Sequence, residues 1–394
     1  MKYDIVRLGE LCELVNGYAF KSKDFVEKGF PVIKIKNVKP NRILLDNLSY
    51  VDGKIVIGKE QYIINKGDIL LTMTGNRYEG SPDTWVGKSA VFMEKGVYYL
   101  NQRLCKILPK TDKINKNYLA YFLSSWDSQL YFIKGATSSG GQANISPMII
   151  KELEIPVPNM GIQNKIAGLL YALDEKIRIN NRINDNLAAL LQTLYQEQFG
   201  DVVSESTQGH LSDLCSYSRD RVSVSRLNAN TYFSTENMLP GKAGATEAAS
   251  LPTTPQTTAC HKGDTLISNI RPYFKKIVYC EDECGCSTDV LCFTPIQSRY
   301  VAYLFSTLYA DKFFAFMVAG SKGTKMPRGD KQQIMSYPIV LPSDEELDEF
   351  NDLALPILTQ IHSNRGENKR LSAVRDALLP KLMSGKIDVS AIQL

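Results

Sequence analysis

The stretch KGDTLISNIRPYF, residues 262–274, repeats a stretch from the first part of the chain, KGDILLTMTGNRY, residues 66–78. Three more pairs occur in the same order: LGELC (8–12) with LSDLC (211–215), NYLAYFLSS (117–125) with RYVAYLFST (299–307), and IPVP (155–158) with IVLP (339–342). The order is kept while the spacing drifts, which indicates a tandem duplication with loops of variable length. We therefore expect two related domains.

Each copy is predicted to be an α+β domain, because strand and helix patterns alternate within it. The segments of the first copy expected to be strands are VIKIKNV (32–38), GDILLTM (67–73), KSAVFM (88–93) and CKILP (105–109). Residues 115–133 have apolar side chains at helical spacing and are expected to be helical. A polar loop rich in Gly, Ser, Thr or Lys follows in both copies, at residues 134–146 and 320–330.

A long helix is predicted to close each copy, because apolar residues recur every seven positions. The recurring positions are Ile166, Leu173, Asn180, Leu187 and Leu194 in the first helix and Phe350, Ile357, Asn364, Leu371 and Leu378 in the second. A second apolar column is formed by Leu170 with Ile177 and by Ala354 with Ile361. We expect residues 162–199 and 346–384 to pair antiparallel; the alternative is that each helix folds back onto its own domain.

Three residues of these helices are exceptional. Asn180 and Asn364 occupy equivalent polar positions in the two seams, and we expect them to fix the register of the helix pair at a cost in stability. Pro356 predicts a kink, or a later start, in the second helix. Gly366 predicts a locally irregular segment in the same helix.

The predicted fold class is therefore α+β, a tandem pseudo-two-fold repeat of two α+β domains separated by two long antiparallel coiled-coil helices. The predicted boundaries are residues 1–158 for the first domain, 159–200 for the first long helix, 201–342 for the second domain, and 343–394 for the second long helix with a C-terminal tail.

The composition excludes some classes of protein. With 44% hydrophobic and 22% charged residues, the chain is expected to be globular rather than disordered or fibrous. It has no apolar run of membrane-spanning length and no signal-peptide pattern, so a cytoplasmic location is expected. Eight irregularly spaced cysteines suit a reducing compartment. The net charge is +4, with the basic excess confined to residues 1–200, which is compatible with a polyanionic partner.

Motifs for catalysis are missing, and we expect no catalytic residues in this chain. GKS at 87–89 lacks the glycine that a phosphate-binding loop requires five residues before Gly87, because that position is Pro82. No dinucleotide, methyltransferase or nuclease motif is recognisable, and the three histidines lie far apart in the sequence. Cys280, Cys284, Cys286 and Cys292, with Cys260 and His261, are the best metal candidates, but their spacing is not that of structural zinc, so no metal site is predicted.

The polar loops instead suggest contact with duplex DNA. Arg and Lys suit phosphates and guanine edges, and Asn and Gln suit adenine edges. The candidates are Thr74, Asn76, Arg77, Tyr78, Lys88, Lys134, Thr137, Ser138, Gln142 and Asn144 in the first copy, and Asn269, Arg271, Tyr273, Lys275, Lys276, Lys322, Lys325, Arg328 and Lys331 in the second. Such loops can also be solvated surface, but their recurrence at equivalent places in both copies favours binding.

At these segments the chain resembles the specificity subunits of type I restriction-modification systems. The resemblance is carried by GDILLTMTG…VGKSAVF (67–92), GATSSGGQANISPMIIKELEIPVP (135–158) and IQNKIAGLLYALDEKIRINNRINDNLAALLQTLYQEQF (162–199). The second copy is more divergent, with GDTLISNIRPYFKKI (263–277) and PRGDKQQIMSYPIVLP (327–342) still recognisable.

The resemblance implies two target-recognition domains, each of which reads one half of a bipartite DNA site, and helices that set the spacer and dock two methyltransferase subunits. It implies restriction and translocase subunits as further partners, and S-adenosylmethionine, ATP and Mg on those partners, with no cofactor on this chain. Two alternatives stay open: a repeat scaffold that binds proteins only, and a fused restriction or methyltransferase enzyme with a cryptic site.

Overall fold

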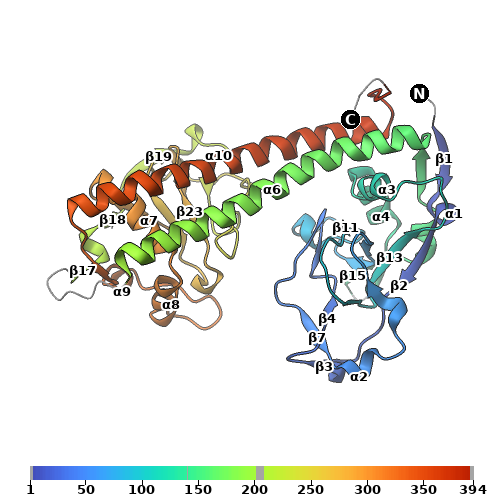
Figure 1. Cartoon of the computed structure of the whole chain (residues 1–394), viewed down its shortest axis with the longest axis horizontal. Coiled ribbons are helices and arrows are strands. Elements are labelled where there is room, and N and C mark those ends of the chain that lie inside the picture. Colours follow the sequence, from blue (N-terminus) through green and yellow to red (C-terminus); the bar gives the residue numbers. More distant parts are fainter. Residues whose placement is uncertain (1–2, 140, 201–207, 391–394) are drawn as a thin grey trace. The chain divides into compact units, whose positions relative to one another are not determined.

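The computed structural model describes residues 3–139, 141–200 and 208–390 of the chain (Figure 1). They form two compact units: unit 1 consists of residues 1–177 and 369–394, and unit 2 of residues 178–368. Each unit contains helices and sheets, so the predicted α+β class is confirmed.

Unit 1 is built on a four-stranded antiparallel sheet in the order β11-β9-β13-β2. Its strands are β11 (Ser89–Val91), β9 (Ile69–Thr72), β13 (Leu104–Pro109) and β2 (Cys12–Asn16). All four residues of β9 are buried, as the apolar run in the sequence predicts for a central strand.

A second sheet of unit 1 has the order β3-β7-β4-β12-β8. It comprises β3 (Phe25–Val26), β7 (Ser49–Val51), β4 (Phe30–Ile33), β12 (Tyr98–Leu100) and β8 (Ile63–Ile64). Between β4 and β12 the pairing is parallel. Smaller elements complete the unit: β1 (Asp4–Arg7), α1 (Leu8–Leu11), β5 (Val38–Lys39), β6 (Arg42–Ile43), α2 (Gly53–Val56), β10 (Thr74–Gly75), β14 (Thr137–Ser139), β15 (Gln142–Asn144), α5 (Pro147–Lys151) and β16 (Glu154–Val157).

Unit 2 repeats the first sheet and part of the second. The order β18-β25-β22-β23 is the order of the first sheet read from the other edge, and β20 pairs parallel with β24 as β4 does with β12. The strands are β17 (Gln208–His210), β18 (Cys215–Tyr217), β19 (Arg221–Ser223), β20 (Tyr232–Phe233), β21 (Gln256–Cys260), β22 (Thr265–Ser268), β23 (Ile277–Tyr279), β24 (Cys284–Cys286), β25 (Val290–Pro295) and β26 (Pro338–Val340). The duplication expected from the sequence is therefore present in the fold.

The segment expected to be helical at 115–133 forms two helices, α3 (Lys116–Leu123) and α4 (Trp126–Gly135). The break occurs because Ser125 acts as the N-cap of α4, accepting a hydrogen bond from the backbone of Ser128. Unit 2 has the same break at Ala310, between α7 (Val301–Tyr309) and α8 (Asp311–Ala319). No single helix in the described part of the chain is long and apolar enough to cross a membrane; only the bent pair 298–309 and 311–319 meets the criteria of length and composition, and α7 is buried in the core of unit 2.

The two long helices are α6 (Met160–Phe199) and α10 (Asp344–Met383), 40 residues each. In unit 2 they run antiparallel, because Asn184 contacts Asn364 while Gln198, further along α6, contacts Glu346 near the start of α10. The core of unit 1 contains Leu170 of α6 and Leu382 of α10. The core of unit 2 contains Leu191 and Phe350 from the other ends of the same helices. The alternative in which each helix packs only on its own domain is therefore wrong.

The predicted late start of the second helix is also wrong. The helix begins at Asp344 and continues through Pro356 and Gly366 to Met383. Proline removes one backbone donor from the helix, but Ile357 and Leu358, which follow it, are buried in the core of unit 2. Tertiary packing of the apolar face therefore outweighs the local preference.

Candidate nucleic-acid interface

In unit 1 the end of the central strand meets the Gly- and Ser-rich loop. The chain leaves β9, forms β10, and pairs there with β15, with Thr74 opposite Asn144 and Gly75 opposite Ala143. β14 pairs with β15 on its other side, so two segments 70 residues apart in the sequence form one three-stranded sheet. Two stretches that the sequence could only propose separately thus make a single surface.

Polar side chains join the two segments. The Thr74 hydroxyl donates to Asn144 Oδ1 at 2.7 Å, and the Arg103 guanidinium donates to both the Thr74 hydroxyl, at 3.2 Å, and Asn144 Oδ1, at 3.3 Å. Arg77 donates from Nη2 to the carbonyl of Ala136, at the base of the loop. Thr74 is buried, whereas Arg103 is exposed. These contacts hold the loop against the strand end.

The remaining candidates of unit 1 divide into surface and interior. Lys134, in the last turn of α4, is exposed, and so are Thr137, Ser138, Gln142 and Tyr78. The Asn76 amide donates to the Thr84 hydroxyl at 3.1 Å.

Lys88 is interior: it is 4% exposed and its ammonium donates to the Asp83 carbonyl at 2.7 Å. Burial, reinforced by repulsion from Lys39 and opposed by Asp83, lowers the pKa of Lys88 to about 8. Lys88 therefore supports the segment between Asn76 and Val86 from inside and presents no charge at the protein surface.

Unit 2 has the same junction, built from different residues. Beyond β22, the backbone N–H of Arg271 donates to the Pro327 carbonyl at 2.8 Å, and Ile270 pairs with Arg328. The Arg271 guanidinium donates to the Lys325 carbonyl at 3.5 Å. The loop at 320–330 closes on itself through two hydrogen bonds between the backbones of Lys322 and Arg328.

The other candidate residues of unit 2 are exposed, paired with carboxylates or buried. Lys325 and Lys331 are exposed, and so is Tyr273. Lys275 and Lys322 form ion pairs, with Asp311 at 2.9 Å and with Asp330 at 2.6 Å. Lys276 donates to the Thr235 carbonyl, and burial lowers its pKa. Asn269 is 7% exposed. Lys276 and Asn269 thus resemble Lys88 in lying behind the surface.

One pair of positions bridges the junction in both units. Arg103 and Asp289 are equivalent, because their carbonyls accept from Met73 N and Asn269 N respectively. Asn144 and Arg328 are also equivalent, because the next residue in each case donates its backbone N–H to the end of the central strand. Ile145 N donates to the Met73 carbonyl, and Gly329 N donates to the Asn269 carbonyl. Arg103 donates to Asn144 in unit 1, whereas Arg328 donates to Asp289, at 3.1 Å, in unit 2. The bridge is kept while donor and acceptor change places.

Sequence reasoning missed Arg103, Asp289 and Trp126. The two bridging residues lie just before β13 and β25, outside the polar loops, so only their strand register could have indicated them. Trp126 begins α4, is 57% exposed, and lies 6.0 Å from Trp85 between ring centroids. A tryptophan at the solvent-exposed start of an apolar helix was the signal available for it.

The two seam asparagines lie between the long helices in unit 2. The Asn180 amide donates to Glu367 Oε2 at 2.7 Å and to Asn368 Oδ1 at 2.9 Å, and the Asn364 amide donates to Asn184 Oδ1 at 2.8 Å. They are 1% and 7% exposed. Each asparagine therefore has its own partners, and a role in setting the register stays a prediction.

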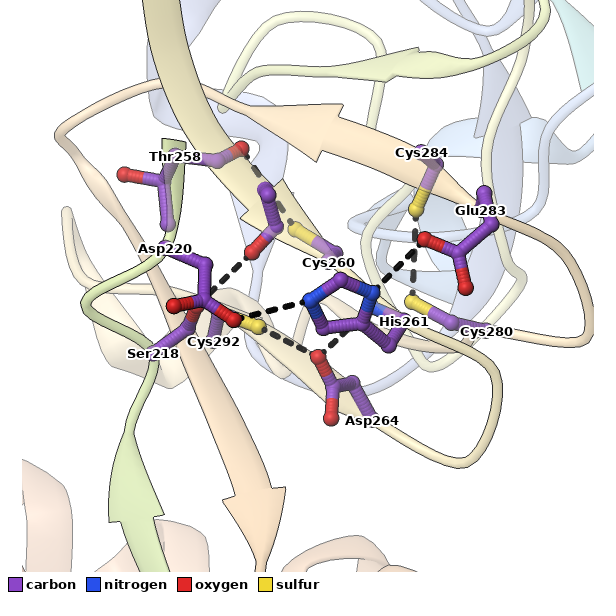
Figure 2. Close-up of polar contacts among 11 residues, drawn as sticks. Ser218, Asp220, Thr258, Cys260, His261, Asp264, Cys280, Glu283, Cys284 and Cys292 are labelled. Carbon is purple, nitrogen blue, oxygen red and sulfur yellow. Dashed lines mark hydrogen bonds and ion pairs between the residues drawn. The ribbon is translucent and has the colours of Figure 1, made fainter. Parts of the chain in front are cut away.

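The cysteine cluster is a buried apolar core (Figure 2). Cys260, Cys280, Cys284, Cys286 and Cys292 are each at most 5% exposed and pack with Met238 and Leu266. The Sγ atoms of Cys284 and Cys280 lie 3.5 Å apart, and Cys292 donates to Asp264 Oδ2 at 3.1 Å. The His261 ring lies between Glu283, at 2.6 Å, and Asp220, at 3.0 Å, and is more exposed than the thiols. Among the described residues, no group of three or more His, Cys, Asp or Glu is arranged to hold a metal ion.

Comparison with known proteins shows which family and which relatives this chain is similar to. Residues 1–189 match the family described as "Type I restriction modification DNA specificity domain". The type I restriction enzyme MjaVIII specificity subunit of Methanocaldococcus jannaschii is 26% identical over 188 residues, which are 47% of this chain and 42% of that protein. The EcoBI specificity subunit of Escherichia coli is 29% identical over 171 residues, 43% of this chain and 31% of that protein. These matches thus span less than half of either relative.

A longer match is to the MjaIX specificity subunit of Methanocaldococcus jannaschii, 24% identical over 357 residues, 84% of this chain and 80% of that protein. The crystal structure of the type I restriction-modification S subunit from M. genitalium is similar over 97% of this chain and 96% of that one, with a TM-score of 0.54 and 16% identity. That likeness supports the fold. The comparisons favour neither the scaffold nor the fused enzyme.

Proposed function

We propose that the whole chain is the DNA-recognition subunit of a type I restriction-modification system, because residues 1–189 match the DNA specificity domain family of such systems. In this proposal unit 1 reads one half of a bipartite duplex site and unit 2 reads the other. The observation that carries it is the repeated junction, in which a polar loop is bonded to the end of the central strand at the same positions in both units.

The chemistry of the junction suits DNA. Exposed Lys134 in unit 1 and exposed Lys325 in unit 2 can contact phosphates. The exposed amide of Gln142 and the Arg328 guanidinium can pair with base edges. Bridges such as Arg103–Asn144 hold these groups in place before DNA arrives, which lowers the entropy lost on binding.

The proposal assigns no catalytic step to this chain. We propose two methyltransferase subunits as partners, with restriction and translocase subunits joining them, and S-adenosylmethionine, ATP and Mg bound by those partners. The helices α6 and α10 contribute to both units and are the proposed docking surface and spacer of the half-sites. We propose the cytoplasm as the location of the complex, because its proposed substrate is DNA.

The test uses the chain assembled with its methyltransferase subunits. Methylome sequencing of the host first names the bipartite site, and anisotropy titrations then compare that site with versions scrambled in one half. We expect Lys134→Glu and Lys325→Glu each to weaken binding. Each should also reduce the slope of log affinity against log salt concentration by about one. We expect Gln142→Ala to relax preference in one half only, and Arg328→Ala in the other. Equal affinity for intact and scrambled sites would contradict the proposal.

A further inference from the structure

Each unit presents an exposed aromatic side chain at the same place in its repeat. Tyr78 and Phe274 each lie ten residues after the aspartate of the shared KGD turn. Tyr78 is 52% exposed, Phe274 is 39% exposed, and Tyr273 beside it is 50% exposed. Large apolar surface left in water at two equivalent positions indicates a binding role, because isolated packing accidents would not recur in both copies.

In unit 1 the Tyr78 ring packs against another aromatic side chain. Tyr78 meets Trp85 edge to face at 5.9 Å between centroids, and Trp85 in turn meets Trp126 at 6.0 Å. The loop that carries Tyr78 is closed at its base by backbone hydrogen bonds from Asn76 N to the Thr84 carbonyl, at 2.9 Å, and from Val86 N to the Asn76 carbonyl, at 2.8 Å. Tyr78 is therefore held on a short, closed loop.

In unit 2 the exposed rings are held by a strained turn. Tyr273 and Phe274 lie in a single turn whose flanking residues, Arg271 and Lys275, both have a left-handed φ of 51°. Non-glycine residues adopt this conformation at a cost, and such strain concentrates at functional sites. The turn is anchored on both sides, because Gly241 N donates to the Phe274 carbonyl at 2.8 Å and Arg271 N donates to the Pro327 carbonyl. The two rings meet at 4.8 Å between centroids.

Both sets of rings are joined to the cationic junctions described above. Arg77 immediately precedes Tyr78 and bonds to the loop base at Ala136. Arg271 starts the aromatic turn of unit 2 and bonds to the carbonyl of exposed Lys325. The rings thus continue the surfaces that carry the positive charge, which favours a polyanionic occupant with flat apolar faces.

We propose that Tyr78 in unit 1 and the pair Tyr273 and Phe274 in unit 2 insert against bases of the two half-sites and unstack one base step in each. This inference rests on the proposed function and adds to it a recognition mode: each half-site is read partly by how readily it deforms. Pyrimidine–purine steps unstack most easily, so such a step is expected opposite each ring.

The experiment places 2-aminopurine, an adenine analogue whose fluorescence is quenched by stacking, at successive positions of each half-site. Binding of the wild-type chain, assembled with its methyltransferase subunits, is expected to raise the fluorescence several-fold at one step per half-site. Tyr78→Ala is expected to abolish the rise in the half-site of unit 1 only, and the double change Tyr273→Ala, Phe274→Ala in the other only. Each variant is expected to bind about ten-fold more weakly.

Matched controls remove exposed apolar side chains elsewhere in the same units: Ile57→Ala, at a residue 74% exposed, and Ile296→Ala, at one 54% exposed. Tyr78→Phe keeps the ring and is expected to keep the signal. Sequence-specific binding without any rise in fluorescence overturns the inference and leaves the proposed function intact. The inference is also overturned if Tyr78→Ala leaves the rise in fluorescence unchanged, or if the only effect of Tyr78→Ala is that the chain no longer assembles with the methyltransferase. Loss of all sequence preference in the wild type overturns both.

Discussion

The same aspartate begins the central strand in both units, but its surroundings differ. Asp68 in unit 1 accepts from Asn65 N at 2.9 Å and lies between two lysines, Lys106 at 3.9 Å and Lys116 at 3.4 Å. Asp264 in unit 2 accepts from His261 N at 2.8 Å. The place of Lys106 is taken there by Cys292, since Lys106 pairs with Leu70 and Cys292 with its repeat equivalent, Leu266.

The comparison separates what the duplicated fold retains from what it exchanges. Both aspartates are buried, at 4% and 1% exposure, and both close the turn through a backbone N–H. The compensating group is an ammonium in unit 1 and a thiol at 3.1 Å in unit 2. Burial raises the pKa of Asp264, with the N–H of His261 and the thiol of Cys292 opposing it. The hydrogen bond to the backbone is thus the common requirement, whereas a nearby cation is replaceable.

The largest expected effect comes from removing the two carboxylates. Asp68→Ala leaves Lys106, whose side chain is 6% exposed, without its counter-charge, and we expect a loss of about 3 kcal/mol in the free energy of unfolding of unit 1. Asp264→Ala removes the backbone cap but leaves no buried ammonium behind, so a loss of about 1–2 kcal/mol is expected in unit 2.

Separate reporters distinguish the units in urea titrations. Both tryptophans of the chain, Trp85 and Trp126, lie in unit 1, so tryptophan fluorescence follows that unit. The buried thiols of Cys260 and Cys286, exposed on unfolding, follow unit 2 through their rate of alkylation. Equal losses in the two units would show that the cation is not what distinguishes them.

A smaller effect is expected from Lys88, whose folded pKa of about 8 lies below its ordinary value of 10.5. The folded state then binds fewer protons than the unfolded state between these values, so unit 1 should become more stable as pH rises from 8 to 10, by on the order of 2 kcal/mol. Lys88→Met should remove this rise, measured by tryptophan fluorescence in urea at each pH. The equivalent change in unit 2, Lys276→Met, is the matched control and should alter the pH dependence less, because Lys276 is less buried.

The smallest effect concerns His261, whose equivalent in unit 1 is Asn65. The carboxylates of Glu283 and then Asp220, which accept hydrogen bonds from the His261 ring, raise the pKa of His261. Its contribution is present in full below pH 6.5 and is lost as pH rises through the raised folded pKa. Since the side chain is 43% exposed, we expect less than about 1 kcal/mol. His261→Asn should flatten the pH dependence of thiol alkylation in unit 2; an unchanged profile would contradict the assignment.

The sequence predicted the duplicated order and the long helices well, because both depend on patterns within one segment. The first helix was expected at 162–199 and occupies Met160–Phe199. The sequence was wrong where distant contacts decide the outcome. Pro356 favours a later start of the second helix, yet α10 begins at Asp344 and continues through Pro356, with Ile357 and Leu358 buried in the core of unit 2.

The candidate site was predictable in part for the same reason. Polar loops could be identified from composition, but the burial of Lys88 and the bridge from Arg103 to Asn144 depend on strand register and on a pairing 41 residues apart. For the cysteines, the spacing argued against structural zinc, but the buried thiol-rich core that they form depends on the fold.

The division of the chain into units has a consequence for biosynthesis. Leu379, Leu382 and Val389 are buried in the core of unit 1, together with residues from the first 177 positions of the chain, whereas all of unit 2 lies between these two segments. On the ribosome, unit 2 can therefore complete its core before unit 1 does, although its residues are made later. Residues 3–177 have to wait for residues 369–390, with Leu170 and its neighbours exposed to chaperones in the interval.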